Sequence, residues 1–167
     1  MKSASLDLFT VSEIELVYKS KVKASERPQI HHSGDAYAVL LNTWDENKLD
    51  FVEQFKVILM NSKNRVLGIV GISSGGMTQT IVDVKTIFAA AIKANALSVI
   101  LAHNHPSGEC GPSKSDKEMT DKINMAGRLL GISVFDHIII SSEGYYSMAE
   151  DREYKLNRQP SVVPMPF

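Results

Sequence analysis

The sequence predicts an α/β (α+β) fold in which a mixed β-sheet is flanked by helices. Apolar runs typical of strands alternate along the chain with amphipathic patterns typical of helices, an order found in layered α/β proteins. Two pairs of neighbouring strand-like runs are joined by short polar turns, which predicts hairpins and therefore antiparallel pairing within the sheet. The 167 residues, 44% of them hydrophobic, are sufficient for one globular core.

The first hairpin is expected in the middle of the chain. Residues 55–60 are an apolar run typical of a strand, and residues 65–72 are expected to form the returning strand. The polar residues 61–64 between them predict a turn. A further strand is expected from about Thr78 to Val82.

The second half of the chain predicts two helices, each followed by a strand. The predicted elements are helices at about 84–95 and 114–130 and strands at 98–102, 132–140 and 145–148. Asp83 is a typical N-cap for the first helix, and Gly131 is a typical C-cap for the second. Apolar residues at helical spacing are expected to face the core: Val84, Ile87, Phe88 and Ala91 in the first helix, and Met119, Ile123, Ala126 and Leu130 in the second.

The chain is expected to have three parts: an N-terminal extension (1–34), one domain (35–156) and a proline-rich flexible tail (157–167). Within the extension, the lysines at every second position over residues 19–23 predict an exposed edge strand that begins near residues 16–18, and a phosphate-binding stripe is the alternative. The domain is expected to begin with a helix or another apolar segment over residues 35–41.

Two histidines follow the strand at 98–102 and are the first candidates for chemistry. Strand side chains alternate between the two faces of a sheet, so His103 and His105 are expected to point to one side and Asn104 to the other. Pro106 then ends the strand. Two imidazoles on one face can bind a single metal ion, whereas the alternative is a pair of histidines that are packed and hydrogen-bonded at the end of a strand.

Asp116 is the candidate for a third ligand. The sequence Ser113-x-x-Asp116 precedes a long helical pattern and has the form of a helix N-cap with an acidic residue at the third helical position. The loop at 106–112 is long enough to fold this first helical turn back over the histidines. Two histidines and an aspartate with an open fourth position are typical of a catalytic zinc, which activates water. A structural zinc more often has four ligands, frequently cysteines, and Cys110 is the single cysteine of the chain.

The spacing His103-x-His105, seven residues, Ser113-x-x-Asp116 resembles the metal signature of the JAMM metalloproteases, also called JAB or MPN+ proteins. This resemblance implies a layered fold related to that of the cytidine deaminases. Deaminase chemistry itself is not expected, because the motifs H-x-E and P-C-x-x-C are both absent from the sequence.

The string from Leu101 to Gly108, together with Pro112-Ser113, resembles the bacterial RadC-type branch of that family. The resemblance covers roughly residues 35–150. RadC-type proteins often carry an N-terminal helix-hairpin-helix domain that binds DNA, and the 34 residues ahead of the predicted domain are too few for one. We therefore expect this chain to lack it.

The resemblance implies a zinc-dependent hydrolase of peptide or isopeptide bonds, with Zn2+ held by the three ligands named above. The family uses a glutamate just ahead of a core strand as general base, and the matching residue is Glu53, which Gln54 separates from Phe55. A solvated glutamate at the start of a strand is the alternative interpretation, and Glu46 is a second candidate for the base. Ser113 matches the family serine that hydrogen-bonds the developing oxyanion.

Two other functions stay open at this point. One is a catalytically silent JAMM-type domain that acts as a protein-interaction module, and the other is a DNA-repair or mobile-element accessory protein. A net charge of −1 argues against direct nucleic-acid binding. The resemblance implies that the partner is a protein or peptide substrate. The single cysteine and the absence of a signal peptide or a long apolar run predict a cytoplasmic protein that is not bound to a membrane.

Overall fold

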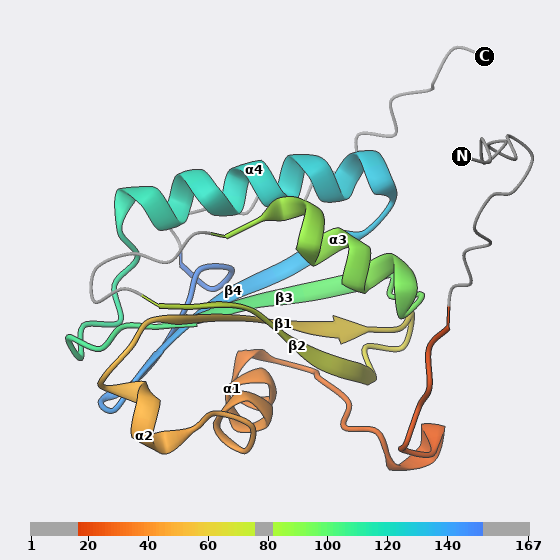
Figure 1. Cartoon of the computed structure of the whole chain (residues 1–167), viewed down its shortest axis with the longest axis horizontal. Helices are drawn as coiled ribbons and strands as arrows, with labels where there is room; N and C mark the ends of the chain where they lie inside the picture. The colour runs from red at the N-terminus through yellow and green to blue at the C-terminus, as the bar shows by residue number, and fades with distance from the viewer. Residues whose placement is uncertain (1–16, 76–81, 152–167) are drawn as a thin grey trace, which may run out of the picture.

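The computed structural model describes residues 17–75 and 82–151, and its centre is a five-stranded mixed sheet (Figure 1). The strands are β1 (Gln54–Met60), β2 (Val66–Ser74), β3 (Ser98–Asn104), β4 (Ser133–Ser141) and β5 (Gly144–Ser147). Their order across the sheet is β2-β1-β3-β4-β5. Strands β3 and β4 are parallel and the other neighbours are antiparallel. The predicted mixed sheet with two hairpins is therefore confirmed.

Helices cover both faces of the sheet. They are α1 (Ser33–Leu41), α2 (Glu46–Leu49), α3 (Val84–Lys93) and α4 (Lys114–Leu130), and a short 3-10 turn spans Ala24–Glu26. In Figure 1, α3 and α4 lie above the sheet and α1 and α2 lie below it. The predicted flanking of the sheet by helices is confirmed, and the two faces of the sheet therefore have different neighbours.

Strand β3 is buried along its whole length because both of its faces are covered. Val99 and Leu101 belong to the core beneath α3 and α4, whereas Ile100 and Ala102 belong to the core that includes α1 residues. This alternation continues to the end of the strand and places successive side chains on opposite faces. The side chains that follow Ala102 are thus expected to alternate between the face covered by α3 and α4 and the face covered by α1.

Helix α4 has the predicted bounds and ends at Gly131, whose φ of 69° is the left-handed conformation that a glycine adopts at low cost. Its buried residues are Thr120, Ile123 and Gly127. The prediction that Leu130 faces the core is wrong, because that side chain is 49% exposed. Gly127 packs against the backbone carbonyl of Ile132, so this side of α4 faces the core. Leu130 lies outside the face that the buried residues of the helix form.

Three expectations about other segments have different outcomes. Residues 17–23 form no strand: Val22 is 48% exposed, and a segment without a buried face has nothing to hold it in register on a sheet.

Of the strand expected at 78–82, residues 78–81 lie outside the described residues and Val82 is not in a strand. The tail at 157–167 also lies outside them. Within residues 17–75 and 82–151, no helix is long and apolar enough to cross a membrane.

Candidate metal centre

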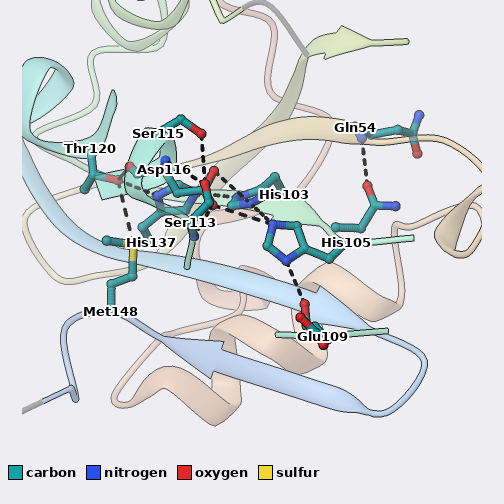
Figure 2. A network of polar contacts seen from close by, with 11 residues as sticks. Gln54, His103, His105, Glu109, Ser113, Ser115, Asp116, Thr120, His137 and Met148 are labelled. Carbon is teal, nitrogen blue, oxygen red and sulfur yellow. Dashed lines mark hydrogen bonds and ion pairs between the residues drawn. The ribbon is translucent and has the colours of Figure 1, made fainter. Parts of the chain in front are cut away.

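The three predicted metal ligands converge at one end of the sheet (Figure 2). His103 and His105 come from the end of β3, and Asp116 comes from the first turn of α4. His103 Nε2 lies 3.3 Å from Asp116 Oδ1, and His105 Nε2 lies 3.6 Å from Asp116 Oδ2. The two Nε2 atoms are 2.9 Å apart, and one ligand atom of each residue lies within 4.8 Å of the others. The structure thus brings together all three side chains.

The capping box at the start of α4 holds Asp116 in place. Ser113 Oγ accepts a hydrogen bond from the Asp116 backbone N–H (3.1 Å), and Asp116 Oδ2 accepts from the Ser113 backbone N–H (2.7 Å). The two predictions made from this motif, a helix cap and a metal ligand, are compatible, because Asp116 Oδ1 still faces His103. The cap therefore orients the carboxylate toward the histidines.

His105 presents Nε2 because its other ring nitrogen is engaged. Its Nδ1 lies 2.6 Å from the carbonyl oxygen of Glu109. A carbonyl oxygen only accepts hydrogen bonds, so Nδ1 carries the hydrogen. The hydrogen bond with Asp116 raises the pKa of His105, while partial burial lowers it to a smaller extent.

His103 lies deeper, with only 1% of its side chain exposed. This burial lowers its pKa from 6.5 to about 4, although the Asp116 carboxylate acts in the opposite direction. The ring is therefore neutral at neutral pH. Its Nδ1 lies 2.7 Å from Nε2 of His137, a residue of β4, so Nε2 is again the atom that faces the other ligands.

Asp116 is an anion in this site. Burial on its own would raise its pKa, but the hydrogen bond from His105, the proximity of His103 and the hydrogen bonds from Ser113 together hold the pKa well below its usual value. Two imidazole nitrogens and one carboxylate are a donor set that zinc accepts in catalytic sites. Each imidazole also has its second nitrogen held by another group, which is typical of metal-binding histidines. The residues present therefore fit a zinc ion.

Comparison with known proteins agrees with this geometry. The family model of the RadC-like JAB domain matches residues 30–154. This chain belongs to the RadC family. A UPF0758 protein of Symbiobacterium thermophilum is 46% identical over 99 residues, which are 59% of this chain and 42% of the relative. A UPF0758 protein of Caldanaerobacter subterraneus is 37% identical over 142 residues, which are 81% of this chain and 61% of the relative. The chain spans about half the length of the curated relatives it matches.

In this RadC-family chain, the predicted general base Glu53 lies just ahead of β1 and is half-buried. Phe55, two residues later, pairs with His103 across the sheet. By the alternation of strand side chains, Glu53 is expected on the face of Phe55, so the intervening Gln54 does not turn it away. The charge of Glu53 also contributes to the raised pKa of His105, which is consistent with a carboxylate near the site. Glu46, the second candidate, is the exposed first residue of α2.

The predicted oxyanion donor, Ser113, lies beside the ligands with its hydroxyl engaged. Ser113 Oγ is 2.6 Å from Asp116 Oδ2 and 2.8 Å from Ser115 Oγ. Cys110 is not part of the ligand cluster: its Sγ lies 2.9 Å from Ser141 Oγ. The segment between His105 and α4 thus contains a serine close to the candidate ligands and a cysteine directed to β4.

Sequence reasoning did not identify three residues that support the site. Asn104 is fully buried and faces α2, and His137 and Thr120 lie behind His103. Two signals were available. Thr120 follows Asp116 by four residues and so shares its helix face, and His137 is a polar residue inside an apolar strand. Neither pattern predicts which side chain Thr120 or His137 contacts.

Proposed function

We propose that this protein is a zinc-dependent hydrolase of peptide or isopeptide bonds. The observation that carries the proposal is the convergence of His103 Nε2, His105 Nε2 and the Asp116 carboxylate, with both Nδ1 atoms engaged elsewhere. Membership of the RadC family, whose model describes a JAB domain, supports the same chemistry. Zinc in a three-ligand site acts as a Lewis acid and lowers the pKa of water toward neutrality.

Glu53 is the residue we assign as general base. Its carboxylate interacts with His105, and its backbone carbonyl accepts a hydrogen bond from the Gly75 N–H at 3.1 Å. This bond anchors the segment just ahead of β1. In that position Glu53 would accept a proton from the attacking water and later return it to the leaving amine.

Ser113 is the residue we assign as oxyanion donor. Its hydroxyl is 2.6 Å from Asp116 Oδ2, so its hydrogen points to that carboxylate in the resting site. Stabilising an oxyanion would require the hydrogen to rotate toward the substrate while Oγ keeps its bond to the Asp116 N–H. Rotation about the Cβ–Oγ bond of Ser113 is sufficient. The hydroxyl oxygen has two lone pairs, so it can accept from the Asp116 N–H while its hydrogen points to the substrate.

A protein or peptide is the substrate class that we propose. A net charge of −1 gives no general attraction for the phosphates of a nucleic acid, so direct DNA binding is not part of the proposal. Binding to DNA at low salt that weakens as the salt concentration is raised would instead favour the accessory role in DNA repair.

The first test is the metal content of untagged protein, measured by elemental analysis. Wild type is expected to hold about one zinc ion per chain, and His103→Ala and Asp116→Ala are expected to lose it. His31→Ala is the control, because His31 lies outside the ligand cluster and is exposed. A wild type that binds no zinc even when zinc is supplied would end the hydrolase proposal and favour a protein-interaction module.

The second test concerns the general base. Glu53→Gln keeps the shape of the side chain but cannot accept the proton, so it is expected to retain zinc and lose hydrolysis of peptide and isopeptide substrates by about 100-fold or more. Glu118→Gln is the control, since Glu118 pairs with Lys114 on the exposed face of α4. Full activity of Glu53→Gln would transfer the role to another residue, and Glu46→Gln would then be measured.

A further inference from the structure

A chain of buried hydrogen bonds runs behind His103 (Figure 2). His103 Nδ1 lies 2.7 Å from His137 Nε2, and His137 Nδ1 lies 2.6 Å from Thr120 Oγ1. Thr120 Oγ1 lies in turn 2.6 Å from the backbone carbonyl oxygen of Asp116. The exposed fractions of His103, His137 and Thr120 are 1%, 0% and 0%. The chain therefore starts at one candidate metal ligand and ends at the backbone of another, in a region closed to solvent.

The end of this chain decides which atom donates each hydrogen bond. The Asp116 carbonyl oxygen only accepts, so the single hydrogen of the Thr120 hydroxyl points to it; the alternative acceptor, Met148 Sδ, is 3.7 Å away. Thr120 Oγ1 must then accept from His137, which places the hydrogen of His137 on Nδ1. His137 Nε2 is consequently bare and accepts from the Nδ1–H of His103.

The last step leaves Nε2 of His103 without a hydrogen. A neutral imidazole carries one hydrogen, and here that hydrogen is on Nδ1. Both rings are closed to solvent, with exposed fractions of 1% and 0%, and such burial favours the neutral imidazole over the charged one. Nε2 of His103, the atom that faces His105 and Asp116, thus presents its lone pair toward the site.

We propose that Thr120 and His137 are positioning residues that fix the tautomer of His103 so that its Nε2 can bind the metal ion. The inference rests on the proposed metal site for its purpose, but the tautomer itself does not depend on a metal. A carboxylate or a carbonyl behind a ligand histidine fixes the tautomer directly, because it only accepts. His137 can accept or donate at either nitrogen, so the direction comes from Thr120.

The decisive measurement is the tautomer of His103 in zinc-free protein, read from the 15N shifts of its imidazole at neutral pH. In wild type the hydrogen is expected on Nδ1. In Thr120→Val, which keeps the shape of the side chain and removes the hydroxyl, the preference is expected to be lost. Thr120→Ser, which restores the hydroxyl, is expected to restore it. A hydrogen on His103 Nε2 in wild type would overturn the proposal, and so would an unchanged tautomer in Thr120→Val.

Zinc affinity, measured by competition with a chelator, is the second readout. Thr120→Val is expected to weaken zinc binding by about 10- to 100-fold, the usual effect of losing a partner behind a ligand histidine. Thr120→Ser is expected to bind zinc like wild type, whereas a purely structural role of the threonine methyl group predicts the reverse order. If wild type binds no zinc, the hydrolase proposal fails. The tautomer of His103, measured in zinc-free protein, still tests whether Thr120 and His137 fix it. If Thr120→Val does not fold, the wild-type tautomer decides it alone.

Discussion

Asn104 lies between the candidate ligands His103 and His105 in the sequence, and in the structure its side chain connects the end of β3 to the segment just ahead of β1. Its Oδ1 accepts from the Gln54 backbone N–H at 2.7 Å, and its Nδ2 donates to the carbonyls of Leu49 (2.6 Å) and Val52 (3.0 Å). The side chain is fully buried. Asn104→Ala would leave these three backbone groups without their partner and release the segment that carries Glu53.

The size of the effect follows from those three bonds. At about 1 kcal/mol for each hydrogen bond, the free energy of unfolding is expected to fall by about 3 kcal/mol. For a chain of this length, that change lowers Tm by about 6–12 °C. His103 and His105 keep their positions through the backbone hydrogen bonds of β3 to its neighbours, so zinc affinity is expected to stay close to wild type. Hydrolysis is expected to fall, because the proposed base Glu53 is no longer held in position.

Urea unfolding of the metal-free protein measures the stability, and chelator competition measures zinc binding. Asn42→Ala is the matched control, since Asn42 is exposed at the end of α1 and its removal is expected to change the free energy of unfolding by less than about 0.5 kcal/mol. A free energy of unfolding for Asn104→Ala that equals the wild-type value would refute the stabilising role of the three Asn104 hydrogen bonds. Loss of zinc together with stability would show that Asn104 supports the ligands rather than the base.

Gly127→Ala is expected to lower the free energy of unfolding by about 1–3 kcal/mol, because the added Cβ would lie 2.4 Å from the Ile132 carbonyl oxygen. Gly71→Ala, whose Cβ would meet nothing within 4 Å, is the control in the same assay, and equal stabilities would contradict the close approach. The metal-free protein is also expected to lose stability as the pH falls from 6.5 to about 4, because the unfolded chain protonates His103 and the folded chain does not. The loss at pH 5 is on the order of 2 kcal/mol, and urea unfolding at two pH values checks it; His103→Gln should reduce the slope.

The ion pair beside His103 does not oppose this loss. The pKa of His105 is raised, so its stabilising contribution is fully present below 6.5 and is lost only as the pH rises through the raised value. The pKa of Asp116 is lowered, so its contribution is present above 3.8 and is lost at more acidic pH. Between these limits the lowered pKa values of His103 and His137 make the stability fall with the pH, and the raised pKa of the buried Asp136 acts in the opposite direction. A stability that does not change across this window would contradict the burial of two neutral histidines.

Short-range rules explain why the sequence predicts so much of the candidate site. The two-residue alternation of a strand places His103 and His105 on one face, and the capping box places Asp116 at the first turn of α4. Both rules act over a few residues and depend little on the rest of the chain. The mixed sheet and the bounds of α4 follow from equally local patterns.

The predictions that failed concern segments whose structure depends on distant partners. Residues 17–23 alternate like a strand, but no strand among residues 17–75 and 82–151 pairs with them, and Val22 stays exposed. Leu130 has the spacing of a core residue, but α4 packs through Gly127 against Phe88 of α3 and the Ile132 carbonyl, and Leu130 lies outside this contact. A periodic pattern gives the geometry of an element, and the surrounding surface then decides which face is buried.

The sequence by itself determined the candidate metal ligands, the cap that orients one of them, and the class of fold. Only the tertiary structure decided what stands behind those ligands. His137 reaches His103 from 34 residues away and Thr120 reaches His137 from 17 residues away, because β4 lies parallel to β3 and α4 crosses above both. Asn104 reaches Leu49 from 55 residues away in the same manner. Hydrogen bonds of this kind depend on strand order and register, which packing of the whole chain fixes and no local spacing records.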